Sequence, residues 1–138
     1  MTDIEKAKTE LKKGGFTFIA VKEDNIIPSS LRGVSPLLKM IDEGTSLEGF
    51  CVADRVVGRA AALLYVTLKA KEIFAEIISE KASEIFEEYG IPYSTEMTVK
   101  RIENRDRTGL CPMESAVMNI DNPSDAETAL RSKLKELT

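Results

Sequence analysis

The alternation of apolar segments in the middle of this chain constrains its fold most. Residues 49–53 (GFCVA) are a continuous apolar run of strand length, as expected for a strand covered on both faces, and residues 72–78 predict a second buried strand. Between them, residues 58–69 predict a helix that is apolar on nearly all sides and therefore buried. Residues 81–89 predict an amphipathic helix closed by Gly90. A strand–helix–strand–helix order at these lengths predicts right-handed crossovers and a partly parallel sheet.

The flanking segments add a hairpin and further helices to this core. Before the core, we expect a helix over 4–11, an antiparallel hairpin with strands 16–21 and 26–27, and a helix over 36–41 with Ser35 as N-cap. After it, we expect an extended segment from 91 and a loop over 100–107. A short helix over 111–118 and a last helix opened by Asn122 should end the chain. The predicted fold class is α/β, a three-layer α/β/α sandwich with a mixed central sheet. At 138 residues the chain has the size of one domain, over 1–138.

The chain contains no histidine, and this narrows its chemistry. Ser-His-Asp and Cys-His catalysis are excluded, and the commonest metal ligand is missing. A tetrahedral zinc site would need Cys51 and Cys111 plus carboxylates, an uncommon ligand set. Two free thiols are the expected state of these cysteines. We therefore predict no metal and no cofactor.

The charge and hydropathy of the chain limit its partners. Its 19 basic and 23 acidic residues give a net charge of -4, so there is no overall basic field to attract nucleic acid or anionic membrane. The longest apolar run, residues 60–66, is too short to span a bilayer, and the N-terminus lacks the apolar segment of a signal peptide. We expect a cytoplasmic protein with no specific nucleic acid or membrane partner, and a homodimer is left open.

Two stretches resemble the signature segments of a small prokaryotic family. They are DRVVGRAAA at residues 54–62 and, much later, TGLCPME at residues 108–114. The chain resembles the domain of unknown function 1893 family, which is assigned to the cytidine-deaminase-like fold, and the resemblance covers nearly the whole chain. It implies a cytidine-deaminase-like domain over 1–138. It implies no reaction, because that family has no settled activity.

The residues at the helix starts differ from those of the zinc deaminases. Those enzymes carry a His/Cys-x-Glu motif at one helix N-terminus and Pro-Cys-x-x-Cys at the next. Here the first helix begins with residues 57–61 (VGRAA), without ligand or glutamate, and the second begins near residues 79–82 (SEKA), without cysteine. Cys111 lies one strand too late and is a single cysteine. The sequence therefore predicts a domain that is not a zinc deaminase.

Polar residues gather where the first buried strand meets the buried helix. Asp54 is expected to end that strand, where ligands bind in open α/β sheets, so it could orient a ribose or a base or act as nucleophile or base. Alternatively it caps the next helix. Gly58 would let a ligand approach the backbone, or serve tight packing. Arg59 at the helix start suits a phosphate, or is a solvated arginine.

A second group of polar residues precedes and begins the short helix near residue 111. The helix dipole would favour the thiolate of Cys111, although a structural cysteine is the alternative. Glu114 could reach back to the start of its own helix, as in a capping box. Cys51 lies in mid-strand and is expected in the core. The charged loop over 100–108 is either an anion clamp or an ordinary charged loop.

These residues support a functional hypothesis with one alternative. We predict a domain that binds a small nucleotide-like ligand at the strand-end pocket. The predicted ligand-binding residues are Asp54, Gly58, Arg59, Arg105, Arg107 and Thr108. The candidate catalytic residues are Asp54, Cys111 and Glu114. The alternative is a non-enzymatic regulatory or protein-interaction module that keeps the fold only, and the sequence does not decide whether the protein is an enzyme.

Overall fold

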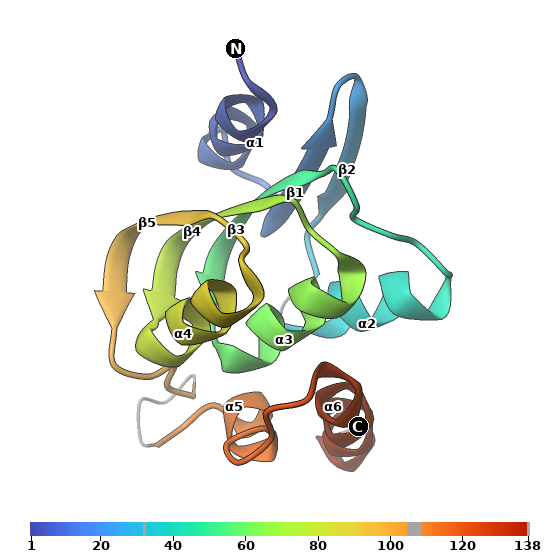
Figure 1. Cartoon of the computed structure of the whole chain (residues 1–138), viewed down its shortest axis with the longest axis vertical. Coiled ribbons are helices and arrows are strands. Elements are labelled where there is room, and N and C mark those ends of the chain that lie inside the picture. The colour runs from blue at the N-terminus through green and yellow to red at the C-terminus, as the bar shows by residue number, and fades with distance from the viewer. Residues whose placement is uncertain (32, 105–108, 138) are drawn as a thin grey trace.

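A mixed five-stranded sheet in the order β2-β1-β3-β4-β5 forms the centre of the protein (Figure 1). The computed structural model describes residues 1–31, 33–104 and 109–137. The strands are β1 (Phe18–Lys22), β2 (Asn25–Ser29), β3 (Cys51–Val57), β4 (Glu72–Ser79) and β5 (Tyr93–Val99). Strand β1 is antiparallel to β2 and β3, whereas β3, β4 and β5 are parallel. The predicted hairpin and the partly parallel sheet are both confirmed.

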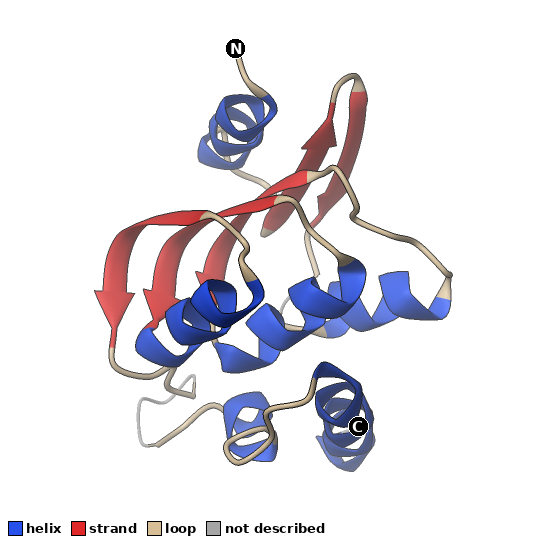
Figure 2. Ribbon diagram, in the orientation of Figure 1, coloured by secondary structure: helices blue, strands red, loops and turns tan. Residues whose placement is uncertain are grey.

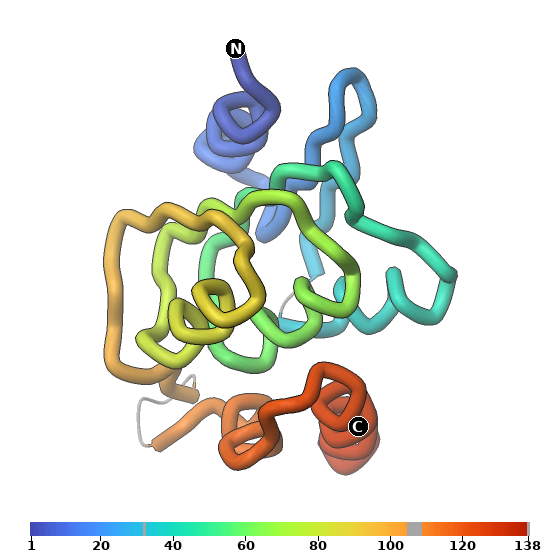
Figure 3. The backbone as a smooth tube through the Cα atoms, viewed as in Figure 1, coloured from blue at the N-terminus to red at the C-terminus, as the bar shows by residue number. Residues whose placement is uncertain are grey.

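Helices cover both faces of this sheet (Figure 2). Helix α1 (Asp3–Lys12) lies on one face, and α2 (Ser35–Asp42), α3 (Arg59–Leu68) and α4 (Glu80–Tyr89) lie on the other. Helices α5 (Pro112–Ala116) and α6 (Pro123–Leu137) pack on the outer side of α3, as the path of the tube shows (Figure 3). The predicted three-layer α/β/α sandwich is confirmed, with α5 and α6 outside its second helical layer.

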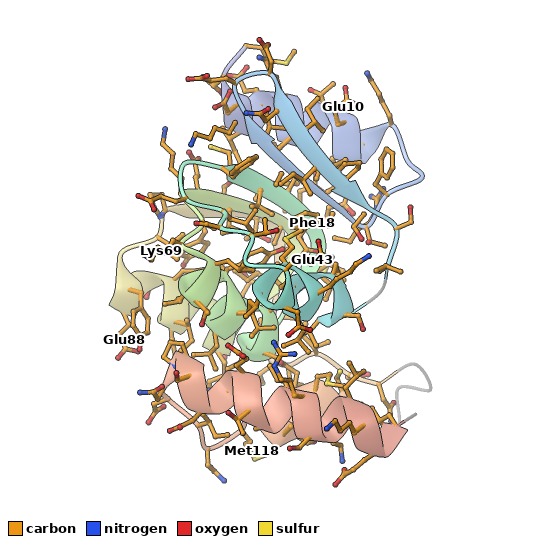
Figure 4. The ribbon with its side chains drawn as sticks, turned by 90° about the vertical axis from the view of Figure 1, so that its right-hand side faces the viewer. Glu10, Phe18, Glu43, Lys69, Glu88 and Met118 are labelled. Atoms are coloured by element: carbon orange, nitrogen blue, oxygen red, sulfur yellow. The ribbon has the colours of Figure 1, made fainter. Side chains whose placement is uncertain are left out.

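Helix α3 is apolar around nearly its whole circumference, and it is covered by the sheet on one side and by α5 and α6 on the other. Leu63 and Leu64 belong to the main core cluster, which joins the sheet to α2, α3 and α4 and also includes Leu130 of α6. Phe18 lies in the middle of this core, between the strands and the helices (Figure 4). A smaller cluster on the opposite face joins the sheet to Leu11 and its neighbours on α1.

Several element boundaries differ from the sequence predictions, and three of these differences involve Asp54, Ser35 and Pro28. Asp54 does not end its strand, because β3 continues to Val57 and pairs with β4 along this length. The N-cap residue of α2 is Val34, and Ser35 is already helical. Strand β2 runs through Pro28, which an edge strand tolerates because one side of it needs no ladder hydrogen bonds.

Within the described part of the chain, no helix combines the length and the apolar character that crossing a membrane requires.

Candidate functional site

A cavity of about 270 Å³ lies where β1, β3, the start of α3 and the segment around α5 meet. Its walls are mostly apolar, and they include Phe18, Val34, Leu37, Ala61 and Met113. Drug-sized ligands occupy pockets of about 300 Å³ or more, so this volume suits a ligand with one or two rings.

Asp54 lines this cavity from the middle of β3. The hydroxyl of Tyr65 donates a hydrogen bond to its Oδ2 at 2.6 Å. Burial raises the pKa of Asp54 to about 6, and hydrogen bonds from Tyr65 and from the backbone of Val56 and Arg55 offset only part of this effect. Burial and the neighbouring Asp54 also raise the pKa of Tyr65, which therefore remains a hydrogen-bond donor. At neutral pH the cavity thus contains a half-buried carboxylate that is mostly ionised.

The N-terminus of α3 is capped by a residue from α5. Glu114 accepts hydrogen bonds from the backbone N–H of Arg59 to Oε1 and of Ala60 to Oε2, each at 2.7 Å. The N-cap residue Gly58 has no side chain, and a Cβ there would lie 2.2 Å from Oε1 of Glu114. Burial raises the pKa of Glu114, against the opposing effect of the two N–H groups and the Arg59 charge. The capping-box prediction is therefore wrong: Glu114 caps α3, not its own helix.

The side chain of Arg59 binds the end of α5 and the residues that follow it. Its Nε donates to the carbonyl of Val117 at 3.1 Å, and its Nη2 donates to the carbonyl of Ile120 at 2.5 Å. Nη2 also forms an ion pair with Asp121 at 2.8 Å. Arg59 and Glu114 together fasten α5 to α3, and Arg59 is not among the described residues that line the cavity.

The structure brings four predicted residues to one cavity. Asp54, Gly58, Cys111 and Glu114 all line it, so the expected convergence of β3, the start of α3 and the Cys111 segment is present. The three predicted ligand-binding residues of the charged loop, Arg105, Arg107 and Thr108, lie outside the described residues. Within the described ranges, no group of three or more His, Cys, Asp or Glu side chains could hold a metal ion.

Tyr65 also belongs to the site and was not predicted from the sequence. Its hydroxyl is the hydrogen-bond partner of Asp54, and its ring stacks with Phe18 at 6.4 Å between centroids. A tyrosine within an otherwise aliphatic buried helix was the available signal, because a buried hydroxyl needs a hydrogen-bond partner.

The two cysteines should differ in reactivity, because Cys51 is buried at 3% exposure whereas Cys111 is half-buried and lines the cavity. We expect the native protein to take up one equivalent of iodoacetamide, at Cys111, and to react at Cys51 only after unfolding. Mass spectrometry of digested protein measures this, with Cys111→Ser as the control. Modification of Cys51 at a similar rate in the native state would contradict the described packing of β3.

Comparisons with known proteins agree with this fold. Residues 6–134 match the model of the family TM1506, described as a domain of unknown function (DUF1893). The crystal structure of a DUF1893 family protein (TM1506) from Thermotoga maritima is similar, with 26% sequence identity and a TM-score of 0.83 over 99% of this chain and 91% of that chain. No curated protein matches this chain. The match to the family model extends over nearly the whole chain, and the chain therefore belongs to the DUF1893 family.

Proposed function

We propose that this domain binds a small nucleotide-like ligand, with the ring of the ligand in the cavity and Asp54 accepting a hydrogen bond from it. The observation that carries the proposal is the half-buried Asp54 carboxylate among mostly apolar walls, with its pKa raised to about 6. An ionised carboxylate is costly in such surroundings. Carboxylates with perturbed pKa values in clefts are frequent at functional sites, which supports a role in binding.

The charges around the cavity indicate which part of the ligand enters it. The charged side chains among its described lining residues are Asp54, Arg55 and Glu114. The guanidinium of Arg55 is engaged elsewhere, since it donates to the carbonyls of Phe16 and Leu11 and to Glu76. A phosphate would therefore meet two carboxylates with no free described cation, whereas a neutral ring with N–H donors would pair with Asp54.

The shape of the cavity and the family resemblance also support a base-like ring. Apolar side chains form most of its walls, and flat heterocycles bind in such surroundings through their faces while a few polar groups fix their orientation. In the cytidine-deaminase-like fold that the sequence resembles, a nucleoside would lie beside the corresponding helix start.

Thermal unfolding in the presence of nucleosides tests this function. A nucleoside at about a hundred times its dissociation constant should stabilise the protein by roughly 2.7 kcal/mol, which raises the melting temperature by several degrees. Asp54→Asn should abolish the shift, because the amide offers one acceptor where the carboxylate offers two. Asp24→Asn, in the exposed turn between β1 and β2, is the matched control and should keep it.

Two results would overturn the proposal. One is the absence of a shift with adenosine, guanosine, cytidine and uridine, which would favour the interaction module. The other is an unchanged shift in Asp54→Asn, which would mean that the ligand binds away from this carboxylate.

A further inference from the structure

A second, more open depression of about 360 Å³ adjoins the cavity. It lies at the carboxyl ends of β3, β4 and β5, where its lining includes Ile77 and Val99. Val56 and Ile102 line both the depression and the cavity, so one apolar wall separates the two spaces. The Val56 side chain is exposed at this wall. A ligand longer than a single ring could therefore extend from the cavity across this wall into the depression.

The depression has the opposite charge character to the cavity. Lys100 and Arg101 both line it and are exposed, and within the described part of the chain neither has a hydrogen-bond or ion-pair partner. Glu103 is the one carboxylate among its described lining residues. By contrast, three other arginines form ion pairs: Arg55 with Glu76, Arg59 with Asp121 and Arg131 with Asp42. The two unpaired cations are thus available to an external anion.

We infer that the depression is the anion subsite of the proposed ligand site, and that the ligand is a nucleoside monophosphate. This inference rests on the proposed function. The base would lie beside Asp54, the sugar across Val56 and Ile102, and the phosphate beside Lys100 and Arg101. Lysine and arginine are the usual partners of phosphate, through charge and through parallel hydrogen bonds respectively. A ligand with N–H donors at one end and an anion at the other matches an acidic cavity next to a basic depression.

Comparing each nucleoside with its 5′-monophosphate tests this inference. By isothermal titration, we expect the monophosphate to bind roughly fivefold tighter at low ionic strength, because two exposed ion pairs add modestly to affinity. The preference should shrink in 0.3 M salt, where exposed charges are screened. The double variant Lys100→Ala/Arg101→Ala should lose the preference and keep the affinity for the nucleoside. The control Lys13→Ala/Lys71→Ala removes the same charge from exposed positions and should keep the preference.

The outcomes separate this inference from the function on which it rests. Nucleosides that bind as tightly as their monophosphates, or a preference that survives in Lys100→Ala/Arg101→Ala, would overturn the anion subsite and leave the nucleoside cavity standing. Failure of both nucleosides and monophosphates to bind would overturn the proposed function itself. Inorganic phosphate that binds as tightly as the monophosphates would show that the base contributes nothing, and would overturn both the proposed function and the assignment of the ligand as a nucleoside monophosphate.

Discussion

Replacing Asp54 by asparagine should stabilise the fold at pH 7.5, by about 1–2 kcal/mol of unfolding free energy. Folding moves this carboxylate into a site where burial raises its pKa from 3.8 to about 6. Keeping it ionised at neutral pH therefore costs up to about 3 kcal/mol. Asparagine has a similar shape, carries no charge and can still accept the hydrogen bond from Tyr65. Its amide must also be buried, which offsets part of the gain.

The gain in unfolding free energy from Asp54→Asn should increase with pH. Because the folded-state pKa of Asp54 is raised, protonation stabilises the native state fully below pH 3.8, and this stability is lost as the pH rises through about 6. The free energy of unfolding of Asp54→Asn should therefore exceed that of the parent most above pH 6, and this difference should shrink towards pH 4. The pKa of Glu114 is also raised, but Glu114 is present in both proteins, so its titration does not change the difference in unfolding free energy between them.

Urea denaturation of Asp54→Asn and the parent at pH 7.5, 6 and 4.5 measures this difference. Asp24→Asn, at an exposed position, should stay within about 0.5 kcal/mol of the parent at each pH. An Asp54→Asn variant less stable than the parent at pH 7.5 would show that the carboxylate stabilises the fold. Asp54 would then have a structural role that explains its presence without a ligand.

Gly58→Ala should cost about 2–3 kcal/mol of unfolding free energy. The backbone is not the cause, because Gly58 has φ -100 and ψ -176, an extended conformation open to any residue. The added Cβ would lie 2.2 Å from Oε1 and 2.6 Å from Cδ of Glu114. The carboxylate would have to leave the N–H groups of Arg59 and Ala60. Hydrogen bonds to charged groups contribute about 1.5–3 kcal/mol each, and water entering the cavity would restore part of that loss.

A double-mutant cycle separates this mechanism from general strain around Gly58. Once Glu114→Ala has removed the carboxylate, adding Gly58→Ala should cost less than about 0.5 kcal/mol, so the two substitutions should be coupled by about 2 kcal/mol. The glycine control is Gly109→Ala, because a Cβ there would meet no atom within 4 Å. Additive costs of Gly58→Ala and Glu114→Ala would show that the close approach to Glu114 is not what requires glycine.

The fold was predictable to the extent that local patterns determine it. The apolar residues of α3 predict a buried helix, and the structure covers this helix with the sheet on one side and with α5 and α6 on the other. The length of β3 was underestimated because its apolar run stops at Asp54. The polar residues that continue the strand have distant partners: Tyr65 for Asp54, and Glu76 for Arg55.

The site was predictable where it depends on the order of elements, and not where it depends on long-range contacts. The turn from β3 into α3 and the segment around Cys111 were expected to meet, and they do. The roles of Arg59 and Glu114 were not predictable, because Glu114 binds a backbone group 54 positions away and Arg59 binds carbonyls at the end of α5. A local pattern at either residue cannot reveal such a partner.

The rate of Cys111 alkylation, with and without the nucleoside that gives the largest thermal shift, tests the ligand cavity most directly. Cys111 lines the cavity and Cys51 is buried, so the native reaction reports on the cavity alone. At ten times its dissociation constant, a nucleoside in the cavity should slow the reaction roughly tenfold, since about nine-tenths of the sites are then occupied. An unchanged rate at that concentration would contradict the account, because the nucleoside would be bound somewhere other than beside Asp54.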